Sequence, residues 1–198
     1  MENKQRDKEY FDRLLSGIVG GDRRALAALY EALKTPVYGL ALSIVKERET
    51  AEDVMQDTFV RVWEMAGQYR PGSDGRAWVM AIARNKALGV LRARRRTAEW
   101  AEREEQTSAR DEIAPLLDRL LLEELLSSLD ITERQIVMLY ATCGYSQKEI
   151  AQLLGRNYAT VRWKFSNAMK KLSRLAEEQE PGRQEMRVLL RETMPDAL

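Results

Sequence analysis

Apolar residues recur every three or four positions along most of this chain, and no segment alternates apolar and polar residues as a half-buried strand would. An α-helix turns once in about 3.6 residues, so side chains spaced in this way line one face and can be buried together. The clearest early example is the series Leu26, Leu29, Tyr30, Leu33, Val37, Leu40, Ala41 and Ile44. The sequence therefore predicts an all-α fold.

Local signals divide the first half of the chain into helices. Pro36 lacks an N–H donor, so we expect it to kink or divide its helix. We expect Thr50 to be the N-cap of the next helix, with Glu52 and Asp53 in the first turn, where acidic groups favour the helix dipole. The sequence RPGSDG at residues 70–75 is rich in turn-forming residues and predicts a loop before a third helix.

The second half carries similar signals. The leucines of residues 116–129 predict one helix. The sequences TERQ at residues 132–135 and SQKE at residues 146–149 have the pattern of a capping box, and each predicts a helix start. Gly155 predicts a helix end in the left-handed conformation, and Asn157 can cap the helix that follows.

Charge is segregated along the chain, although the formal net charge is only +1. Residues 76–96 contain seven basic residues and no acidic one, and residues 156–174 contain six basic residues and no acidic one. Between them, residues 97–112 contain six acidic residues and two arginines. This pattern predicts two modules joined by an acidic linker. A single basic run is typical of a solvated helix face, but two runs beside aromatic residues favour a polyanionic partner.

The composition excludes several classes of function. The chain has no histidine, which excludes histidine metal sites and histidine-dependent catalytic triads, so we expect no metal, no cofactor and no enzymatic activity. Cys143 is the single cysteine and cannot form an internal disulfide, which fits a reducing cytoplasm. No apolar run approaches the roughly 20 residues that span a bilayer, and the N-terminal residues lack the apolar core of a signal peptide. We therefore expect a cytoplasmic protein without membrane insertion.

The segment after Gly155 combines an apolar stripe with a basic outer face. The residues that we expect to be buried are Val161, Phe165, Ala168, Leu172 and Leu175. Trp163 lies opposite this stripe, with Arg162 and Lys164 on either side, and an exposed tryptophan is unfavourable unless a partner covers it. Two helices joined by a glycine turn, the second with this face, predict a DNA-binding helix-turn-helix. The alternative is a plain antiparallel helical hairpin.

Three motifs occur together, in the order AEDVMQDTFVRVWE, GRAWVMAIARNKALGVLRARRR and LDITERQIVMLYATCGYSQKEIAQLLGRNYATVRWKFSNAMKKL. With them the chain resembles bacterial sigma factors, and among these the small extracytoplasmic-function (ECF) class, which has only regions 2 and 4. The resemblance covers residues from about Asp22 to Leu175. It implies a dissociable subunit of RNA polymerase that directs promoter recognition and melting. It also implies that an anti-sigma factor usually binds the protein.

The resemblance also implies a domain organisation. Region 2 would occupy residues 1–96 and would dock on core polymerase and recognise and melt the minus-ten element. A flexible acidic linker would follow at residues 97–112, and region 4 would read the minus-thirty-five element with residues 113–175. Residues 176–198 lie outside the resemblance, and their sequence could form one short amphipathic helix.

By position, the resemblance assigns three sets of site residues. Those expected to dock on the β′ clamp helices of core polymerase are Asp53, Gln56 and Asp57. The β subunit of core polymerase is a further expected partner of the protein. Those expected to handle the single-stranded non-template strand of the minus-ten element are Gly72, Ser73, Asp74, Gly75, Arg84, Asn85, Lys86, Arg92, Arg94, Arg95 and Arg96. Those expected to contact the minus-thirty-five duplex are Asn157, Tyr158, Ala159, Arg162, Trp163, Lys164, Ser166, Asn167 and Lys170.

Some residues depart from the family pattern. The family often has a bulky aromatic residue in the loop at Gly75, and none lies between Pro71 and Arg76 here. Trp163 stands where a small residue is common, and Asn167 and Met169 stand where arginines are common. We expect these changes to alter the promoter sequence that is read. The alternative function is a stand-alone helix-turn-helix regulator, which would leave the acidic docking helix unexplained.

Overall fold

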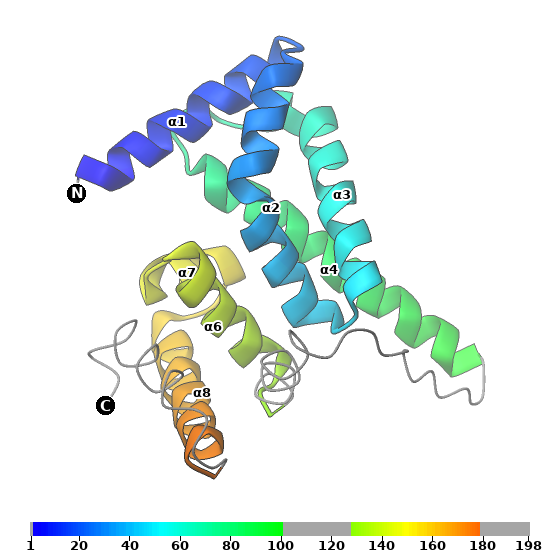
Figure 1. Ribbon diagram of the computed structural model, residues 1–198, viewed down its shortest axis with the longest axis vertical. Coiled ribbons are helices and arrows are strands. Elements are labelled where there is room, and N and C mark those ends of the chain that lie inside the picture. Colours follow the sequence, from blue (N-terminus) through cyan, green and yellow to red (C-terminus); the bar gives the residue numbers. More distant parts are fainter. Residues whose placement is uncertain (1, 101–127, 179–198) are drawn as a thin grey trace. The chain divides into compact units, whose positions relative to one another are not determined.

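The computed structural model describes residues 2–100 and 128–178, and every regular element in these residues is helical. The all-α prediction is therefore confirmed. The chain divides into two units, Met1–Trp100 and Ala101–Leu198. Figure 1 labels their α-helices, which are α1 (Glu2–Val19), α2 (Arg23–Val45), α3 (Arg48–Met65), α4 (Gly75–Trp100), α6 (Ile131–Cys143), α7 (Gln147–Leu154) and α8 (Tyr158–Glu178). A 3₁₀ turn, η1 (Ala66–Gln68), follows α3. None of the helices in the described ranges is long and apolar enough to cross a membrane.

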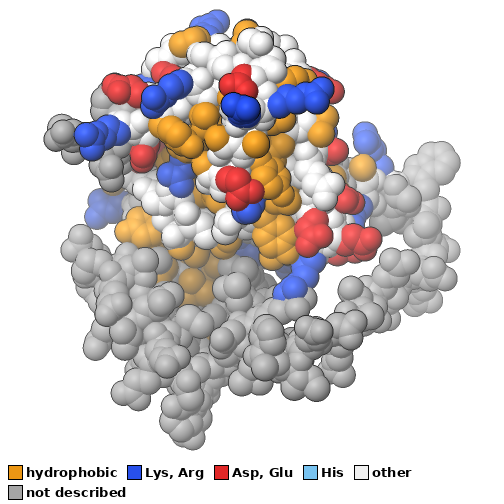
Figure 2. Space-filling view, turned by 45° about the horizontal axis from the view of Figure 1, so that its top comes forward, with side chains coloured by type: hydrophobic (Ala, Val, Ile, Leu, Met, Phe, Trp, Pro, Cys, Tyr) orange, Lys and Arg blue, Asp and Glu red, His pale blue; other side chains and the backbone are white. Residues whose placement is uncertain are grey.

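The first unit is organised around α2, which packs against α1, α3 and α4 (Figure 1). Its largest fully buried side chains are Leu15, Leu29, Leu33, Val37, Leu40, Ile44, Val62, Val79 and Met80. These residues come from all four helices, so the acidic helix α3 and the basic helix α4 are anchored in one core. The face shown in Figure 2 carries Lys and Arg side chains interspersed with Asp and Glu, around exposed hydrophobic side chains, so neither sign of charge dominates it.

Of the two alternatives predicted for Pro36, a kink or a division of the helix, the division is excluded, and the N-cap predicted at Thr50 is wrong. Pro36 does not divide its helix, because α2 runs continuously through it and buries it. Thr50 is not an N-cap, because α3 begins at Arg48 and its N-cap position is Glu47. The chain leaves α2 through Lys46, whose φ of 63° is left-handed, and becomes extended at Glu47, so the helix starts earlier than predicted. The Thr50 hydroxyl instead donates a hydrogen bond of 2.5 Å to the Glu47 carboxylate.

The first unit also extends past its predicted boundary. Helix α4 continues to Trp100, so the first four residues of the linker predicted at 97–112 are helical. The rest of that linker and residues 116–127 of the leucine-rich helix lie outside the described residues. Of the predicted tail, residues 176–178 belong to α8, and residues 179–198 lie outside the described range.

The second unit packs α6 and α7 against α8. The capping box predicted at TERQ is displaced, because the N-cap of α6 is Asp130, whose carboxylate accepts hydrogen bonds of 2.8 Å from the N–H groups of Thr132 and Glu133. Glu133 completes the box by accepting from the Asp130 N–H at 2.9 Å. The aspartate one position before Ile131 therefore does what was predicted for Thr132. The capping box of Ser146 and Glu149 at the start of α7 is confirmed.

Candidate functional site

The predicted polymerase-docking residues lie on one exposed face of α3. Asp53, Gln56 and Asp57 are all exposed, at spacings of three and one along the helix. The opposite face buries Val54, Phe59 and Val62 in the core of the first unit, which leaves the polar face outward. The helix therefore presents two carboxylates and an amide from an element that is anchored in the core.

This face contains an apolar residue that the sequence analysis missed. Val60 is 57% exposed and lies three and four positions after Asp57 and Gln56, so it shares their face. Trp63, on the same helix, is also 38% exposed. The periodicity did carry the signal for Val60, because it is out of phase with Val54 and Phe59.

The basic residues of α4 do not form one group. The Lys86 ammonium pairs with the Asp57 carboxylate at 2.9 Å, and the Arg94 guanidinium pairs with Glu47 and Thr50. Both cations are therefore turned toward α3 rather than left free for phosphates. Hydrogen bonds from Thr50 and then from Arg94 hold the pKa of the Glu47 carboxyl below its usual value. Because these pairs are solvated, each adds little to stability.

A second group on α4 faces outward. Asn85, Arg92 and Arg96 are exposed, and their spacings of seven and four place them on one helix face. Arg84 is half-buried and interacts with other groups of the protein. The side chain of Arg95 lies outside the described residues. The outward face can therefore offer an amide and guanidinium groups to a nucleic-acid strand.

The loop before α4 packs against α1. Gly75, predicted to contact DNA, is instead buried, and a Cβ added there would lie 2.9 Å from Leu15 Cδ1 and 3.0 Å from Phe11 Cβ. The sequence contains no sign of this contact, because α1 lies far away along the chain. Asp74 caps α4 by accepting from the Ala77 N–H at 2.8 Å. Asp74 therefore has a structural role at the helix start.

Gly72 and Ser73 form the exposed tip of this loop. Gly72 has a φ of 83°, a conformation that glycine adopts without strain. Its N–H donates to a carboxylate oxygen of Asp12 at 2.9 Å, and the Ser73 hydroxyl donates to the Arg70 carbonyl at 2.6 Å. The tip is therefore exposed but ordered by hydrogen bonds within the protein.

The turn between α7 and α8 has the predicted geometry. Gly155 ends α7 with a left-handed φ of 61°, and its N–H group and that of Arg156 donate to carbonyls of the last turn. Asn157 accepts a hydrogen bond of 2.8 Å from the Ala159 N–H and thereby caps α8. Three residues therefore connect the two helices, as a helix-turn-helix requires.

Helix α8 has one buried and one exposed face. Val161, Phe165, Ala168 and Leu172 are buried as predicted, and the Phe165 ring packs 4.8 Å from that of Tyr140 on α6. The exposed residues predicted to contact DNA are Asn157, Tyr158, Ala159, Arg162, Trp163, Ser166 and Lys170. Trp163 is 61% exposed, and Asn167, at the border of this face, is half-buried. The structure thus gathers an indole, cations and small polar groups on one surface.

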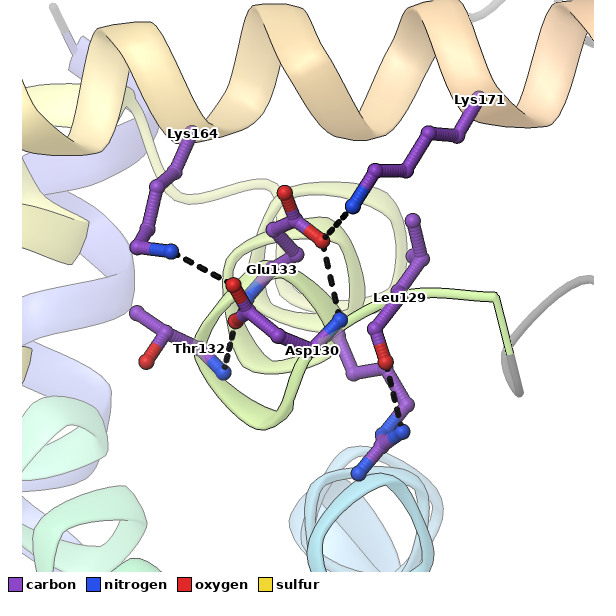
Figure 3. Close-up of polar contacts among 7 residues, drawn as sticks. Leu129, Asp130, Thr132, Glu133, Lys164 and Lys171 are labelled. Carbon is purple, nitrogen blue, oxygen red and sulfur yellow. Dashed lines mark hydrogen bonds and ion pairs between the residues drawn. The ribbon is translucent and has the colours of Figure 1, made fainter.

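Lys164 of α8 differs from its predicted placement. Lys164 turns toward its own unit, where its ammonium donates to the Asp130 carboxylate at 2.6 Å, and its side chain is only 22% exposed (Figure 3). Met169, which stands where the family often has an arginine, is buried. Lys164 therefore connects α8 to the start of α6.

Lys171, seven residues after Lys164, makes a second contact of the same kind. The Lys171 ammonium donates to Glu133 at 2.7 Å, next to the Lys164–Asp130 pair (Figure 3). Burial raises the pKa of the Asp130 carboxyl, but the hydrogen bonds from Lys164 and from the backbone of α6 outweigh it and hold that pKa below its usual value. The two pairs fix the outward face of α8 relative to α6.

Profiles of protein families match both units. Sigma-70 region 2 matches residues 29–97, and sigma-70 region 4 matches residues 119–172. The RNA polymerase sigma factor CarQ of Myxococcus xanthus is 32% identical over 164 residues, which are 81% of this chain and 94% of CarQ. The ECF RNA polymerase sigma factor SigK of Mycobacterium sp. (strain JLS) is 24% identical over 169 residues, which are 81% of this chain and 88% of SigK.

Solved structures show the same fold. CnrH, solved with the cytosolic domain of CnrY, is 26% identical with a TM-score of 0.68, covering 86% of this chain and 99% of that one. The sigma factor RpoE of Bartonella quintana, solved with the anti-sigma factor NepR, is 22% identical with a TM-score of 0.68, covering 78% and 98%. Two sigma regions in one chain do not favour a stand-alone regulator. Because both regions and nearly the full length of a relative match, the chain belongs to the ECF sigma factors of bacterial RNA polymerase.

Proposed function

We propose that this sigma factor divides its task among three surfaces, each on a different helix. The exposed face of α3 docks on the β′ clamp helices of core polymerase. The tip of the loop before α4, with the outward face of α4, captures the unpaired minus-ten strand. The outward face of α8 reads the minus-thirty-five duplex. The protein performs no chemical step itself, acts in the cytoplasm where the polymerase is, and is controlled by an anti-sigma factor.

The observation that carries this proposal is the exposed face of α8. Trp163, beside Arg162 and Ser166, is 61% exposed, so a large apolar surface is left in water and would be stabilised by a partner that covers it. The major groove of DNA admits a helix, phosphates attract cations, and a thymine methyl offers an apolar contact. Asn167 could hydrogen-bond an adenine edge, a pair worth about 1–3 kcal/mol of discrimination.

The proposed role of α8 predicts which changes affect sequence preference. Trp163→Ala and Asn167→Ala should alter the minus-thirty-five preference of holoenzyme in a binding assay with a randomised upstream element. Lys170→Ala should weaken binding evenly across sequences and reduce its salt dependence. Wild-type preference at every upstream position in both Trp163 and Asn167 variants would remove α8 as the reading surface.

The docking role of α3 has its own test. Asp53 and Gln56 are exposed and make no contribution to the core, so changing both to alanine should leave helicity unchanged. Assembly with core polymerase should weaken. Val60→Ser should weaken it further if the Val60 side chain is covered in the complex. Because Glu64 lies further along the same helix and outside the proposed set, Glu64→Ala serves as the control. Normal assembly of the double variant would contradict the docking assignment.

The minus-ten role is tested at the loop. Replacing Gly72 and Ser73, the exposed tip, together with Asn85→Ala on the outward face of α4, should change base preference at one or two melted positions. The assay is open-complex formation by holoenzyme on promoters randomised at the minus-ten element. If the variant still melts the promoter and its base preference at the minus-ten element is unchanged, another part of the protein must read the base.

The anti-sigma proposal rests on the solved relatives. The structures of CnrH and RpoE contain a CnrY domain and the anti-sigma factor NepR, respectively. An anti-sigma factor for this chain would compete with core polymerase. The expected result is that purification of the tagged protein from cells grown without induction recovers one inhibitory partner. Added in excess to purified holoenzyme, that partner should lower promoter-specific transcription.

A further inference from the structure

The N-terminal helix α1 lies outside both family matches, which begin at residues 29 and 119, yet it contacts the loop before α4. The contact is made by Asp12, whose two carboxylate oxygens have different partners. One oxygen accepts from the Tyr69 hydroxyl, and the other accepts from the Gly72 N–H at 2.9 Å. A single carboxylate thus joins the start of the loop to its tip.

Tyr69 extends this contact along the loop. Its hydroxyl also lies 3.1 Å from the Ser73 carbonyl, and its ring packs 5.5 Å from that of Trp78 on α4. Burial, followed by the hydrogen bond to Asp12, raises the pKa of Tyr69 to about 12. The phenol therefore keeps its proton at neutral pH and remains a hydrogen-bond donor.

The same helix supports the far end of the loop. Gly75 packs directly against Leu15 and Phe11, which flank Asp12 on α1. The loop is thus fixed at its beginning, its tip and its end by neighbouring residues of one helix. Hydrogen bonds to an ionised carboxylate are about twice as strong as those between neutral groups, so this arrangement restricts the loop more than turn residues alone would.

We propose that Asp12 is a positioning residue that sets the conformation in which the loop of residues 69–75 reads the unpaired minus-ten base. This inference rests on the proposed minus-ten role of the loop. Asp12 itself touches no base. It acts through Tyr69 and the Gly72 N–H, and it gives the loop rigidity where the family's frequent aromatic residue is absent.

The test compares Asp12→Ala and Tyr69→Phe with Asp7→Ala, which removes the same charge from an exposed position of α1. Holoenzyme made with each full-length variant is assayed for open-complex formation on promoters randomised at the minus-ten element. We expect Asp12→Ala to reduce the preference for the best base at the loop-dependent positions by about five- to tenfold. Tyr69→Phe should have a smaller effect in the same direction, and Asp7→Ala should have none.

Asp12→Asn provides a rescue that a purely structural role would not predict. Its carbonyl can accept from the Gly72 N–H while its amide donates to the Tyr69 oxygen, so base preference should return most of the way toward wild type. Minus-thirty-five preference and assembly with core polymerase, measured in parallel, should not change in any variant.

The outcomes separate the two proposals. If replacing the loop tip changes base preference and Asp12→Ala does not, the positioning role is wrong and the reading loop stands. If replacing the tip changes nothing, the minus-ten assignment fails, and the role of Asp12 fails with it. If Asp12→Ala lowers assembly and both promoter preferences alike, Asp12 is a stability residue only. Should Asp12→Ala fail to fold, Tyr69→Phe, which removes one hydroxyl, distinguishes the same outcomes.

Discussion

Replacing Gly75 by alanine measures how firmly α1 is packed under the loop. The added Cβ would lie 2.9 Å from Leu15 Cδ1, 3.0 Å from Phe11 Cβ and 3.3 Å from the Tyr69 hydroxyl oxygen. The Phe11 Cβ is attached directly to the backbone of α1, so it can yield only if the helix moves. Overpacking of this kind costs about 1–3 kcal/mol, and the gain from replacing a helical glycine offsets at most about 1 kcal/mol. With the full offset, we therefore expect a net loss of up to about 2 kcal/mol.

Gly89 offers a matched control within α4. A Cβ added there has no neighbouring atom within 4 Å in the described structure, so Gly89→Ala should stabilise the helix by about 0.5–1 kcal/mol. The two alanine variants should therefore differ by about 2 kcal/mol, although each adds one methyl group to the same helix.

The measurement must report on the first unit alone. Three of the four tryptophans, Trp63, Trp78 and Trp100, lie in Met1–Trp100, so a Trp163→Phe background makes fluorescence specific for that unit. Urea unfolding then gives the free energy, and the thermal midpoints should differ by several degrees, since about 1 kcal/mol shifts a domain of this size by about 4–8 °C. Equal stabilities for Gly75→Ala and Gly89→Ala would show that α1 is not packed tightly against Gly75.

Further consequences concern ion pairs, pH and salt. Glu133→Ala removes a carboxylate, 4% exposed, that accepts from the Asp130 N–H and from Lys171, and it should lower the free energy of unfolding of the second unit by about 2 kcal/mol in urea. The pKa of Asp130 is lowered in the folded state, so its contribution to stability is present above its unfolded pKa of about 3.9 and is lost as the pH falls through the folded pKa. Asp130→Asn should therefore reduce the fall of the thermal midpoint with decreasing pH. The raised pKa of Tyr69 acts in the opposite direction, because its contribution to stability is present below its unfolded pKa of about 10 and is lost as the pH rises through about 12. The late-titrating step in the tyrosinate absorbance should be missing in Tyr69→Phe. For DNA binding by holoenzyme, Arg92→Ala should reduce the slope of log affinity against log salt by about 1, and Lys86→Ala by less, because Lys86 would exchange the Asp57 carboxylate for a phosphate.

Short-range chemistry could be predicted from the sequence. The capping box of Ser146 and Glu149, the left-handed Gly155 and the Asn157 cap each depend on residues within four positions, and all three occur as expected. The prediction for α6 missed by two residues, because Asp130 and Thr132 both have capping side chains and only the tertiary context decides between them. Local rules therefore gave the helices from α2 onward and the starts of α7 and α8, but they gave neither α1 nor the starts of α3 and α6.

The direction of long side chains could not be predicted in the same way. Lys164 and Lys86 each have four flexible methylene groups, and each finds a carboxylate on another helix, 34 and 29 positions away along the chain. Asp12 is separated from Tyr69 and Gly72 by 57 and 60 positions, and a single aspartate on an exposed-looking helix carries no pattern. Helical periodicity gives the face on which a residue lies, but packing decides which partner its side chain reaches.

The chain has 32 basic and 31 acidic residues, so the positive charge of its two basic segments is balanced by acidic residues elsewhere, and some of these lie in direct contact with the basic helices. Part of their charge is neutralised within the fold, because Lys86 pairs with Asp57 and Lys171 pairs with Glu133. Exposed residues such as Arg92 and Lys170 carry charge on the outward faces of α4 and α8. The paired cations join the helices to one another, and the exposed cations are placed where phosphates could approach. Since only the second group adds a full counterion-release term, the affinity for DNA should be more moderate than the number of basic residues suggests.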